Sequence, residues 1–154
     1  ISDVDGVLTD GKLYYGTDGE EVKVFHAHDG LAIKQLMKMG IKIGLLSARD
    51  SAPLRSRAEE LGINYTNFGE EDKLKGCKVL MDKMGINPES IAYVGDDVND
   101  IQPAANVGWS YAVANASHEL KLQVNQILKK SGGTGIFSEI KDDILEHYSN
   151  FIDD

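Results

Sequence analysis

The sequence of 154 residues is poor in cysteine, in basic residues and in long apolar runs. Its single cysteine, Cys77, excludes an internal disulfide and a zinc site built from several thiolates. Acidic residues outnumber basic ones by 25 to 16, and the formal net charge of -9 repels nucleic acids and anionic membranes. No apolar run approaches the roughly 20 residues of a membrane-spanning helix, and no signal peptide precedes the first strand. We therefore expect a cytoplasmic protein with no nucleic-acid and no membrane partner.

The length fits a single domain over residues 1–154, with a core large enough to need no disulfide. The first residue is not methionine, and only Ile1 and Ser2 precede Asp3. That is too short for a buried strand of ordinary length. We therefore expect further residues upstream of Ile1, either a short segment or a whole preceding domain.

Two acids, Asp3 and Asp5, stand one residue apart at the end of the first apolar stretch. On an extended strand they share a face, unless the strand ends between them. Such crowding of like charge is costly unless a cation, a phosphate-handling role or a proton relieves it. Gly6 follows directly and lets the backbone turn sharply and approach a ligand closely. We interpret this stretch as the catalytic end of a strand.

The rest of the chain alternates short apolar runs with amphipathic stretches. Residues of about 12–25 form two alternating runs around a glycine-bounded turn, which predicts a β-hairpin. Helices are predicted at 31–39 with Asp29 as N-cap, 53–61, 72–84, 101–107, 118–124 and 137–148. Strands are predicted at 41–46, 63–68, 91–94 and, at a sheet edge, 111–113. A flexible glycine-rich segment, 131–135, opens the C-terminal tail and helix of about 131–154.

This alternation predicts an α/β domain with a Rossmann-like, doubly wound, mainly parallel sheet. In such sheets ligands bind beyond the carboxyl ends of the strands. Three groups of polar residues fall at predicted strand ends: Asp3 with Asp5, Ser47, and the run from Asp96 to Asp100. We therefore expect these groups to form one site.

The acids of this site suit magnesium and phosphate chemistry. Mg²⁺ prefers oxygen ligands, which Asp3, Asp96 and, as a third candidate, Asp100 could supply together with a phosphate oxygen. Asp3 could then attack a phosphoryl group in line. Asp5 could protonate the leaving alkoxide and later deprotonate water.

Ser47 and Lys73 are the candidates for holding the remaining phosphate oxygens. An alternative is structural: Asp3 and Asp5 would be ordinary turn acids, and the acids between 96 and 100 would only cap a helix. Both clusters stand at strand ends of one predicted sheet, with a lysine ahead of the second. This combination favours catalysis over the structural alternative.

The stretches Asp3–Gly11, Ser47, Lys73 and Gly95–Asp100 occur in the order of the four motifs of the haloacid dehalogenase superfamily of phosphatases. The sequence resembles this family over essentially its whole length. It is most similar to a capless branch that acts on phosphate esters of eight- or nine-carbon keto sugar acids, or is fused behind acylneuraminate cytidylyltransferases. The resemblance implies a fold without a cap domain, and a Mg²⁺-dependent phosphatase that forms an aspartyl-phosphate on Asp3.

Further roles are implied by the resemblance alone. The metal ligands would be Asp3, the backbone carbonyl of Asp5, and Asp96, with support from Asp97, Asn99 and Asp100. Ser47 and Lys73 would bind phosphate. The substrate would face Asp5, His28, Asp29, Gly30, Lys34, Arg49, Arg57 and Lys73.

Some positions depart from the branch and bear on the substrate. His26-Ala27-His28 stands where asparagine-valine-arginine is typical, and Lys34 stands where arginine is favoured. Lysine binds a carboxylate only as a point charge, so bidentate recognition there would be lost. Arg49 is kept where nine-carbon enzymes tend to have glutamate, which favours an eight-carbon keto-deoxy sugar acid 8-phosphate. A nine-carbon 9-phosphate, or a phosphatase-like domain that tetramerises a cytidylyltransferase, stays open, as do the roles of His26 and His28.

The resemblance also implies a homotetramer assembled through the hairpins, with a neighbour's C-terminal tail closing the site. A capless site would otherwise be open to water, which is unfavourable for a reactive acyl phosphate. Tyr14, Tyr15 and Phe25 give the hairpin apolar side chains for partner contact. We expect truncation at Ser131 to lower turnover and specificity while leaving the fold intact.

Overall fold

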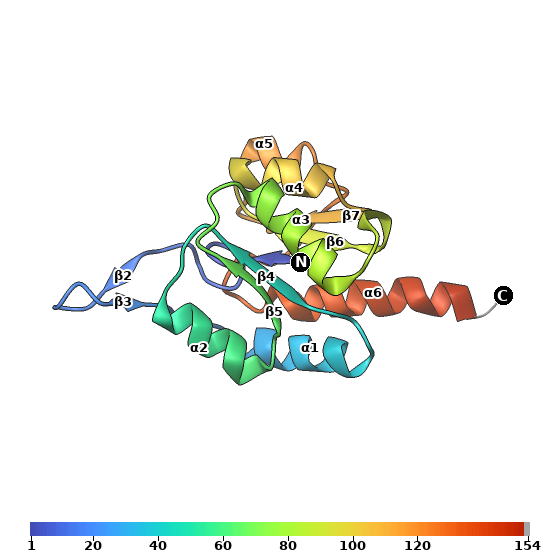
Figure 1. Cartoon of the computed structure of the whole chain (residues 1–154). Coiled ribbons are helices and arrows are strands. Elements are labelled where there is room, and N and C mark those ends of the chain that lie inside the picture. The colour runs from blue at the N-terminus through green and yellow to red at the C-terminus, as the bar shows by residue number, and fades with distance from the viewer. Residues whose placement is uncertain (153–154) are drawn as a thin grey trace.

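The computed structural model describes the backbone of residues 1–152 and the side chains of residues 1–147 (Figure 1). Its strands are β1 (Ser2–Asp3), β2 (Tyr14–Tyr15), β3 (Glu21–Val22), β4 (Gly44–Ser47), β5 (Tyr65–Phe68), β6 (Ala92–Gly95), β7 (Trp109–Ala112) and β8 (Gln126–Ile127). Its α-helices are α1 (Ala27–Lys38), α2 (Ala52–Leu61), α3 (Lys73–Met84), α4 (Ile101–Ala105), α5 (His118–Lys121) and α6 (Ile136–Ile152). Two 3₁₀ turns are η1 (Pro88–Ser90) and η2 (Val98–Asp100). Among these helices, none has the length and apolar character needed to cross a membrane.

The main sheet has the strand order β5-β4-β1-β6-β7-β8. Strand β1 pairs in parallel with β4, through Ser2 opposite Leu45 and Asp3 opposite Leu46, and with β6 through Ser2 opposite Val94. The chain first builds the side with β4 and β5, then returns to build β6, β7 and β8 on the other side of β1. Open α/β sheets bind ligands at such a switch, beyond the carboxyl ends of the strands. The predicted doubly wound sheet is confirmed, and its described strands are all parallel.

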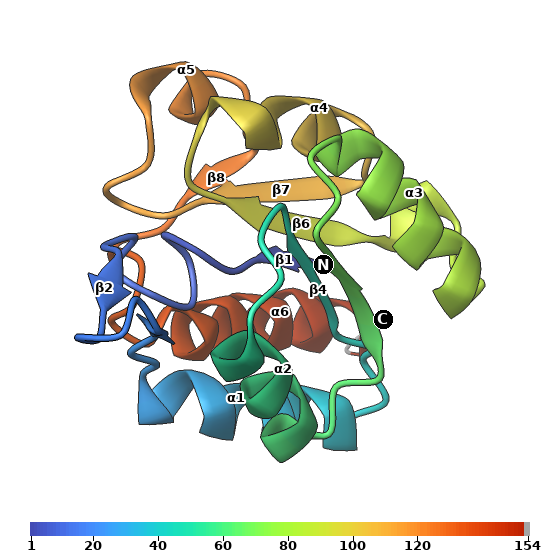
Figure 2. The ribbon, with the colours of Figure 1, turned by 60° about the vertical axis from the view of Figure 1, so that its left-hand side comes forward.

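Helices cover both faces of this sheet (Figure 2). Helices α1, α2 and α6 lie on one face, and α3 and α4 lie on the other. Strand β4 is buried at every position, and its Leu45 and Leu46 are fully buried. A strand that is covered on both faces needs a continuous apolar run. This is why residues 41–46 predicted a strand although their apolar and polar residues do not alternate.

A hairpin of β2 and β3 lies between β1 and α1, where the described chain has no separate cap domain. It projects from the body of the molecule (Figure 1). One of its faces is apolar and open, with Val22 and Val24 47% and 57% exposed and Tyr14 opposite Val22. On the returning strand Glu21, Lys23 and Phe25 are half-buried, in alternation with the two exposed valines. The hairpin therefore turns one face to the domain and leaves the other open.

The C-terminal tail is part of the domain core. The Gly133 N–H donates to the Val7 carbonyl at 2.9 Å, and helix α6 packs against α1. This helix buries the apolar side chains of Ile136, Phe137 and Ile140. The expectation of a flexible segment at 131–135 is therefore wrong. Truncation at Ser131 would remove core side chains, so the expectation that it leaves the fold intact is wrong too.

Some element boundaries also differ from the predictions. Helix α1 begins at Ala27 with His26 as its N-cap, and the predicted cap, Asp29, lies in the first turn. Strand β7 is not an edge strand, because β8 pairs with it through Tyr111 opposite Gln126. Strand β8 escaped prediction because two residues are too few to show a pattern. Helices α4 and α5 are shorter than the predicted 101–107 and 118–124.

Candidate active site

The carboxyl ends of β1, β4 and β6 meet at one cleft of about 170 Å³. Asp3 is the last residue of β1, Ser47 is the last residue of β4, and Asp96 directly follows β6. The cleft is lined by Asp3, Asp5, Ser47, Ala48, Arg49, Lys73, Asp96, Asp97 and Asn99. The three groups of residues that the sequence placed at separate strand ends are therefore neighbours.

Asp3 lies in a buried cluster of acids that surrounds Lys73. Carboxylate oxygens of Asp3, Asp96 and Asp100 lie within 4.8 Å of one another. The Lys73 Nζ is 2.8 Å from Asp3 Oδ1 and 2.7 Å from Asp100 Oδ1. Burial alone would lower the pKa of Lys73, but the charges of Asp3 and Asp100 raise it above its ordinary value. Lys73 is therefore held in its charged form between two carboxylates.

One ammonium group cannot neutralise three carboxylates, and the pKa values of the acids reflect this. Burial, followed by the charge of Asp100, raises the pKa of Asp3 well above its ordinary value. Burial likewise raises the pKa of Asp96 to about 6. A hard divalent cation binds carboxylate oxygens and would relieve this excess of negative charge. The residues present therefore fit a magnesium ion.

Asp100 organises the cluster, since both of its oxygens already accept hydrogen bonds. Its Oδ1 accepts from the Tyr93 hydroxyl at 2.6 Å and from Lys73 at 2.7 Å. Its Oδ2 accepts from the backbone N–H groups of Asp96 at 2.9 Å and Asp97 at 3.2 Å. Asp97 and Asp100 form a capping box on η2, so the alternative of helix capping is correct for these two acids. It does not explain Asp96, whose carboxylate lies in the acid cluster.

Two glycines allow this close approach of backbone and carboxylate. Gly6 has φ +89°, and a Cβ there would lie 1.9 Å from Asp96 Oδ2. A Cβ on Gly95 would lie 2.4 Å from the Asp100 Cβ. The Asp96 carboxylate therefore lies against the backbone at Gly6, directly after Asp5, whose carbonyl is the expected third metal ligand.

Ser47 and Arg49 form the β4 side of the cleft. Ser47 is buried, and its Oγ accepts the Arg49 N–H at 3.1 Å. The hydroxyl hydrogen of Ser47 thus stays available for an anion in the cleft. Arg49 lies at the rim and is exposed, where a guanidinium group can bind an anionic substrate.

Lys23 is a site residue that the sequence interpretation missed. Its Nζ lies 2.6 Å from Asp5 Oδ1 and 2.8 Å from Glu21 Oε1, and its side chain is only 3% exposed. The alternation along residues 21–25 could have indicated it, because a lysine on the inward face of an amphipathic strand needs an acidic partner. Asn99, which the sequence suggested as a supporting residue, also lines the cleft.

Five predicted substrate contacts do not line this cleft. Asp29 is buried and accepts the Phe137 N–H at 2.8 Å, so it caps the start of α6. Burial raises the pKa of Asp29. The five residues are His28, Asp29, Gly30, Lys34 and Arg57. The histidine, glycine and lysine stand on α1, and the lysine is exposed.

Arg57 makes several contacts within this chain that are structural. It donates to the His26 carbonyl at 3.3 Å and to Glu60 at 2.9 Å, and it lies over the Phe25 ring. A Cβ on Gly30 would lie 2.7 Å from the guanidinium group. Arg57 thus ties α2 to the start of α1. His26 Nδ1 accepts the N–H of His28 at 3.1 Å, which uses this ring nitrogen for capping.

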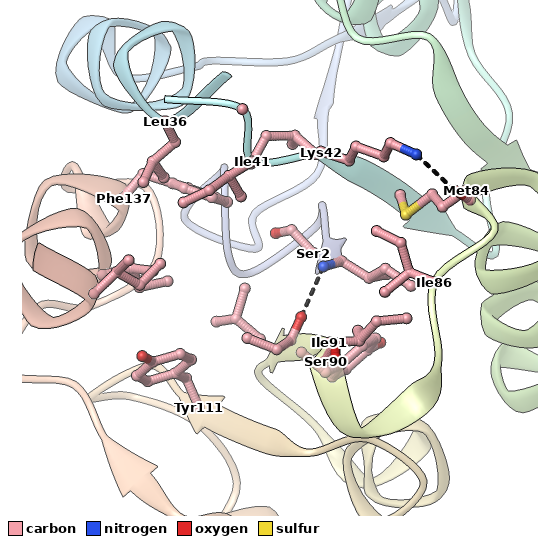
Figure 3. Close-up of a pocket in the computed structure, with 18 residues that line it drawn as sticks. Ser2, Leu36, Ile41, Lys42, Met84, Ile86, Ser90, Ile91, Tyr111 and Phe137 are labelled. Atoms are coloured by element: carbon pink, nitrogen blue, oxygen red, sulfur yellow. Dashed lines mark hydrogen bonds between the residues drawn. The ribbon is translucent and has the colours of Figure 1, made fainter. Parts of the chain in front are cut away.

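A larger cavity lies at the opposite end of the sheet (Figure 3). Its volume is about 400 Å³, and its lining is dominated by apolar side chains such as Leu36, Ile86 and Phe137. The Lys42 ammonium group at its rim donates to the Met84 carbonyl at 2.7 Å. This cavity has no convergent acids, so the smaller polar cleft is the candidate active site.

Known proteins are similar to this chain in both sequence and fold. A family model for haloacid dehalogenase-like hydrolases matches residues 18–108. The 3-deoxy-D-manno-octulosonate 8-phosphate phosphatase KdsC of Haemophilus influenzae is 46% identical over 146 residues, which cover 95% of this chain and 81% of that protein. The Yersinia pestis protein of the same name is 39% identical and is covered to 78%.

Solved structures agree with these matches. The cobalt-bound phosphatase from Haemophilus influenzae superposes with a TM-score of 0.91 at 46% identity, covering 94% of this chain and 85% of that one. The Moraxella catarrhalis 3-deoxy-D-manno-octulosonate 8-phosphate phosphatase, in complex with magnesium, phosphate and KDO, also gives 0.91, at 35% identity and with coverage of 98% and 88%. With the acid cluster, the parallel sheet and these matches in agreement, the chain belongs to the haloacid dehalogenase-like hydrolases.

Proposed function

We propose that this protein is a Mg²⁺-dependent phosphatase that hydrolyses 3-deoxy-D-manno-octulosonate 8-phosphate (KDO 8-phosphate) to KDO and phosphate. The observation that supports it most is the cluster of Asp3, Asp96 and Asp100 around Lys73 at the switch point of the sheet. The relatives named for this reaction cover nearly the whole chain. A cluster of buried acids with one lysine suits the transfer of a phosphoryl group, whose charge must be neutralised.

The reaction begins with Asp3 as nucleophile. Its carboxylate attacks phosphorus and forms an aspartyl-phosphate, while the bond to the sugar oxygen breaks. Asp5 protonates the leaving alkoxide, then takes a proton from the water that hydrolyses the intermediate. Asp3 and Asp5 can have different roles because β1 ends at Asp3 and Asp5 lies in the following turn.

Lys73 and Ser47 orient the phosphate. Lys73 already contacts Asp3, so its ammonium group can bridge the nucleophile and a phosphoryl oxygen. The Ser47 hydroxyl donates to a second oxygen. Asp3, Asp96 and the Asp5 carbonyl would hold Mg²⁺, which supplies neutralisation of the phosphate charge.

Arg49 is the residue of this chain that favours an eight-carbon sugar acid. It lines the cleft rim, beyond the phosphate-binding residues, where the sugar part of the substrate would lie. A guanidinium group binds a carboxylate through two parallel hydrogen bonds. Lys34 and Arg57 do not line the cleft, so within one chain the carboxylate recognition rests on Arg49.

We further propose that the active form is a homotetramer in the cytoplasm. Its protomers would meet through the hairpins, whose open face presents Val22 and Val24. A neighbour's tail would close the cleft. The glycines of the tail pack on their own protomer, so such a contact would involve a later part of the tail. Closure would protect the aspartyl-phosphate from misdirected water.

Phosphate release tests the catalytic proposal. The wild-type protein should release phosphate from KDO 8-phosphate with Mg²⁺ and lose this activity in chelator. Asp3→Asn should abolish it, by at least about 10⁴-fold, because an amide is a poor nucleophile. The matched control is Asp82→Asn, which changes an exposed acid on α3. Nine-carbon 9-phosphates run in parallel would reveal a different substrate, and an active Asp3→Asn protein would contradict the mechanism.

A further inference from the structure

Lys23 is a buried lysine that the mechanism above does not use. It follows β3 in the returning arm of the hairpin, and its Nζ lies 2.6 Å from Asp5 Oδ1. Its side chain is 3% exposed and does not line the cleft, so it does not bind substrate. We propose that Lys23 is a positioning residue, which holds the Asp5 carboxyl group in the orientation for proton transfer. This inference rests on the proposed phosphatase function.

Asp5 needs such a partner because little else holds its side chain. It lies beyond the end of β1, and its side chain is 25% exposed. Among the described residues, Lys23 is the only hydrogen-bond partner of its carboxylate, and Oδ2 has none. Asp3, in contrast, is nearly fully buried and is fixed by Lys73. A catalytic group must be held to within about 0.5 Å of its working position, which a carboxylate that rotates freely does not satisfy.

Lys23 can fix Asp5 because Glu21 fixes Lys23 in turn. The Glu21 carboxylate lies 2.8 Å from the same Nζ, on the same inward face of the hairpin strand. Burial alone would lower the pKa of Lys23, but hydrogen bonds and charges from Asp5 and Glu21 raise it. An ion pair that is shielded from solvent is little affected by salt, so its geometry persists. The two acids thus both hold the ammonium group.

This arrangement divides the work between the two oxygens of Asp5. Oδ1 accepts the hydrogen bond from Lys23, and Oδ2 carries the proton. When the P–O bond breaks, its electron pair goes to the sugar oxygen, which takes the proton from Oδ2 and leaves Asp5 as a carboxylate. The attacking water later returns a proton to Oδ2. Lys23 keeps its own proton throughout, so it acts only through Asp5.

Loss of Lys23 should therefore affect proton donation to the leaving group and spare phosphate binding. A sugar alkoxide is a poor leaving group and needs the proton, whereas 4-nitrophenolate leaves without one. In Lys23→Met, kcat for KDO 8-phosphate should fall about 10- to 100-fold, and kcat for 4-nitrophenyl phosphate should fall less than about threefold. KM for both should change little. Lys23→Arg should recover part of the loss, because it keeps the charge and the donors.

Lys12→Met is the matched control, because Lys12 lies on the same hairpin with an exposed ion pair to Asp10 at 4.0 Å. It should behave as wild type with both substrates. If Lys23→Met slows both substrates equally, or neither, the positioning role is overturned. If the wild-type protein hydrolyses neither phosphate ester, the proposed function fails instead.

A second variant keeps the test decisive if Lys23→Met does not fold. Glu21→Gln keeps both Lys23 and Asp5 and removes only the outer charge that fixes the ammonium group. It should slow KDO 8-phosphate hydrolysis about two- to fivefold and leave 4-nitrophenyl phosphate unaffected, since the ion pair with Asp5 persists in a looser geometry. If Glu21→Gln changes the rates on both substrates by the same factor relative to wild type, this would count against the proposal.

Discussion

At the scale of single residues, Asp96 links the electrostatics of the site to its metal. It follows β6, it is only partly buried, and burial raises its pKa to about 6. The pKa of Asp3 is raised as well, through burial and the nearby Asp100. In both cases the metal-free protein makes the charged carboxylate less favourable than it is in water. A divalent cation reverses this preference, because it binds the deprotonated form.

Stability should therefore depend on pH and Mg²⁺ together. The pKa of Asp96 lies above the ordinary 3.8, so its favourable contribution is full below that value and is lost as the pH rises through about 6. Mg²⁺ compensates for this loss only where the carboxylate is deprotonated. We expect the Mg²⁺-induced rise in Tm to be small at pH 5 and large at pH 8, as measured by thermal unfolding with Mg²⁺ or with chelator. Asp96→Asn should make this rise small at both pH values, and an equal rise in the wild-type protein at both would contradict the assignment.

The sequence could predict the site residues that lie at the ends of strands, because the sheet brings these ends together. Asp3, Ser47 and Asp96 end or follow parallel strands, so alternation of elements alone places them at one edge of the sheet. Lys23 and Asp29 could not be found in this way. Lys23 and Asp29 contact Asp5 and Phe137 because of how the hairpin and α6 pack. The sequence does not reveal that packing.

At the scale of elements, the loop after β1 is held in place by the glycine-rich segment 131–135. The Gly133 N–H bonds to the Val7 carbonyl at 2.9 Å, and Gly132 bonds to Asn115 at 3.0 Å. A Cβ on Gly132 would lie 1.8 Å from the Gly6 carbonyl oxygen. The glycine-rich composition of this segment suggested flexibility, because glycine permits many backbone conformations. Composition does not reveal that these glycines are needed for close contacts. The segment is instead a packing surface for the catalytic loop.

Gly132→Ala should consequently disturb both stability and catalysis. The added methyl group has no room against the backbone of the loop, so the loop or the tail must shift, at a cost of roughly 1–3 kcal/mol in the free energy of unfolding. We expect kcat to fall with it, because Asp5 precedes the displaced Gly6. Urea unfolding and phosphate release are the two measurements. Gly16→Ala is the control, since its nearest neighbour would be at 3.5 Å. Equal behaviour of the two variants would show that the loop does not depend on this contact.

At the scale of the whole molecule, the two ends of the sheet and the hairpin divide the functions. The carboxyl ends hold the polar cleft, and the opposite end holds an apolar cavity. The hairpin has an inner face with Lys23, which reaches Asp5, and an outer apolar face with Val22 and Val24. The alternation of the sequence predicted the sheet and the hairpin, and the family resemblance implied the missing cap. Alternation could not predict the extra strand β8, which owes its pairing to β7 and has no pattern of its own.

The outer face of the hairpin should determine the assembly of the molecule. Val22 is 47% exposed and Val24 is 57% exposed, and this exposure of apolar side chains costs free energy in water that is recovered when a second copy covers them. We expect Val22→Ser combined with Val24→Ser to convert the proposed tetramer to smaller species, as measured by light scattering after gel filtration. The thermal unfolding of each protomer should change little, because neither side chain is buried in the core.

Leu122→Ser is the matched control, because Leu122 is 72% exposed as the C-cap of α5, away from the hairpin, and its removal should leave the proposed tetramer intact. A hairpin variant that stays tetrameric would assign the interface to another surface, and a monomeric wild-type protein would exclude the assembly altogether. Activity then separates assembly from positioning. If the disassembled variant keeps kcat for 4-nitrophenyl phosphate but loses kcat for the sugar phosphate, the neighbour contributes to the closed site. If it keeps both, the inner face of the hairpin, through Lys23 and Asp5, is sufficient for catalysis within one chain.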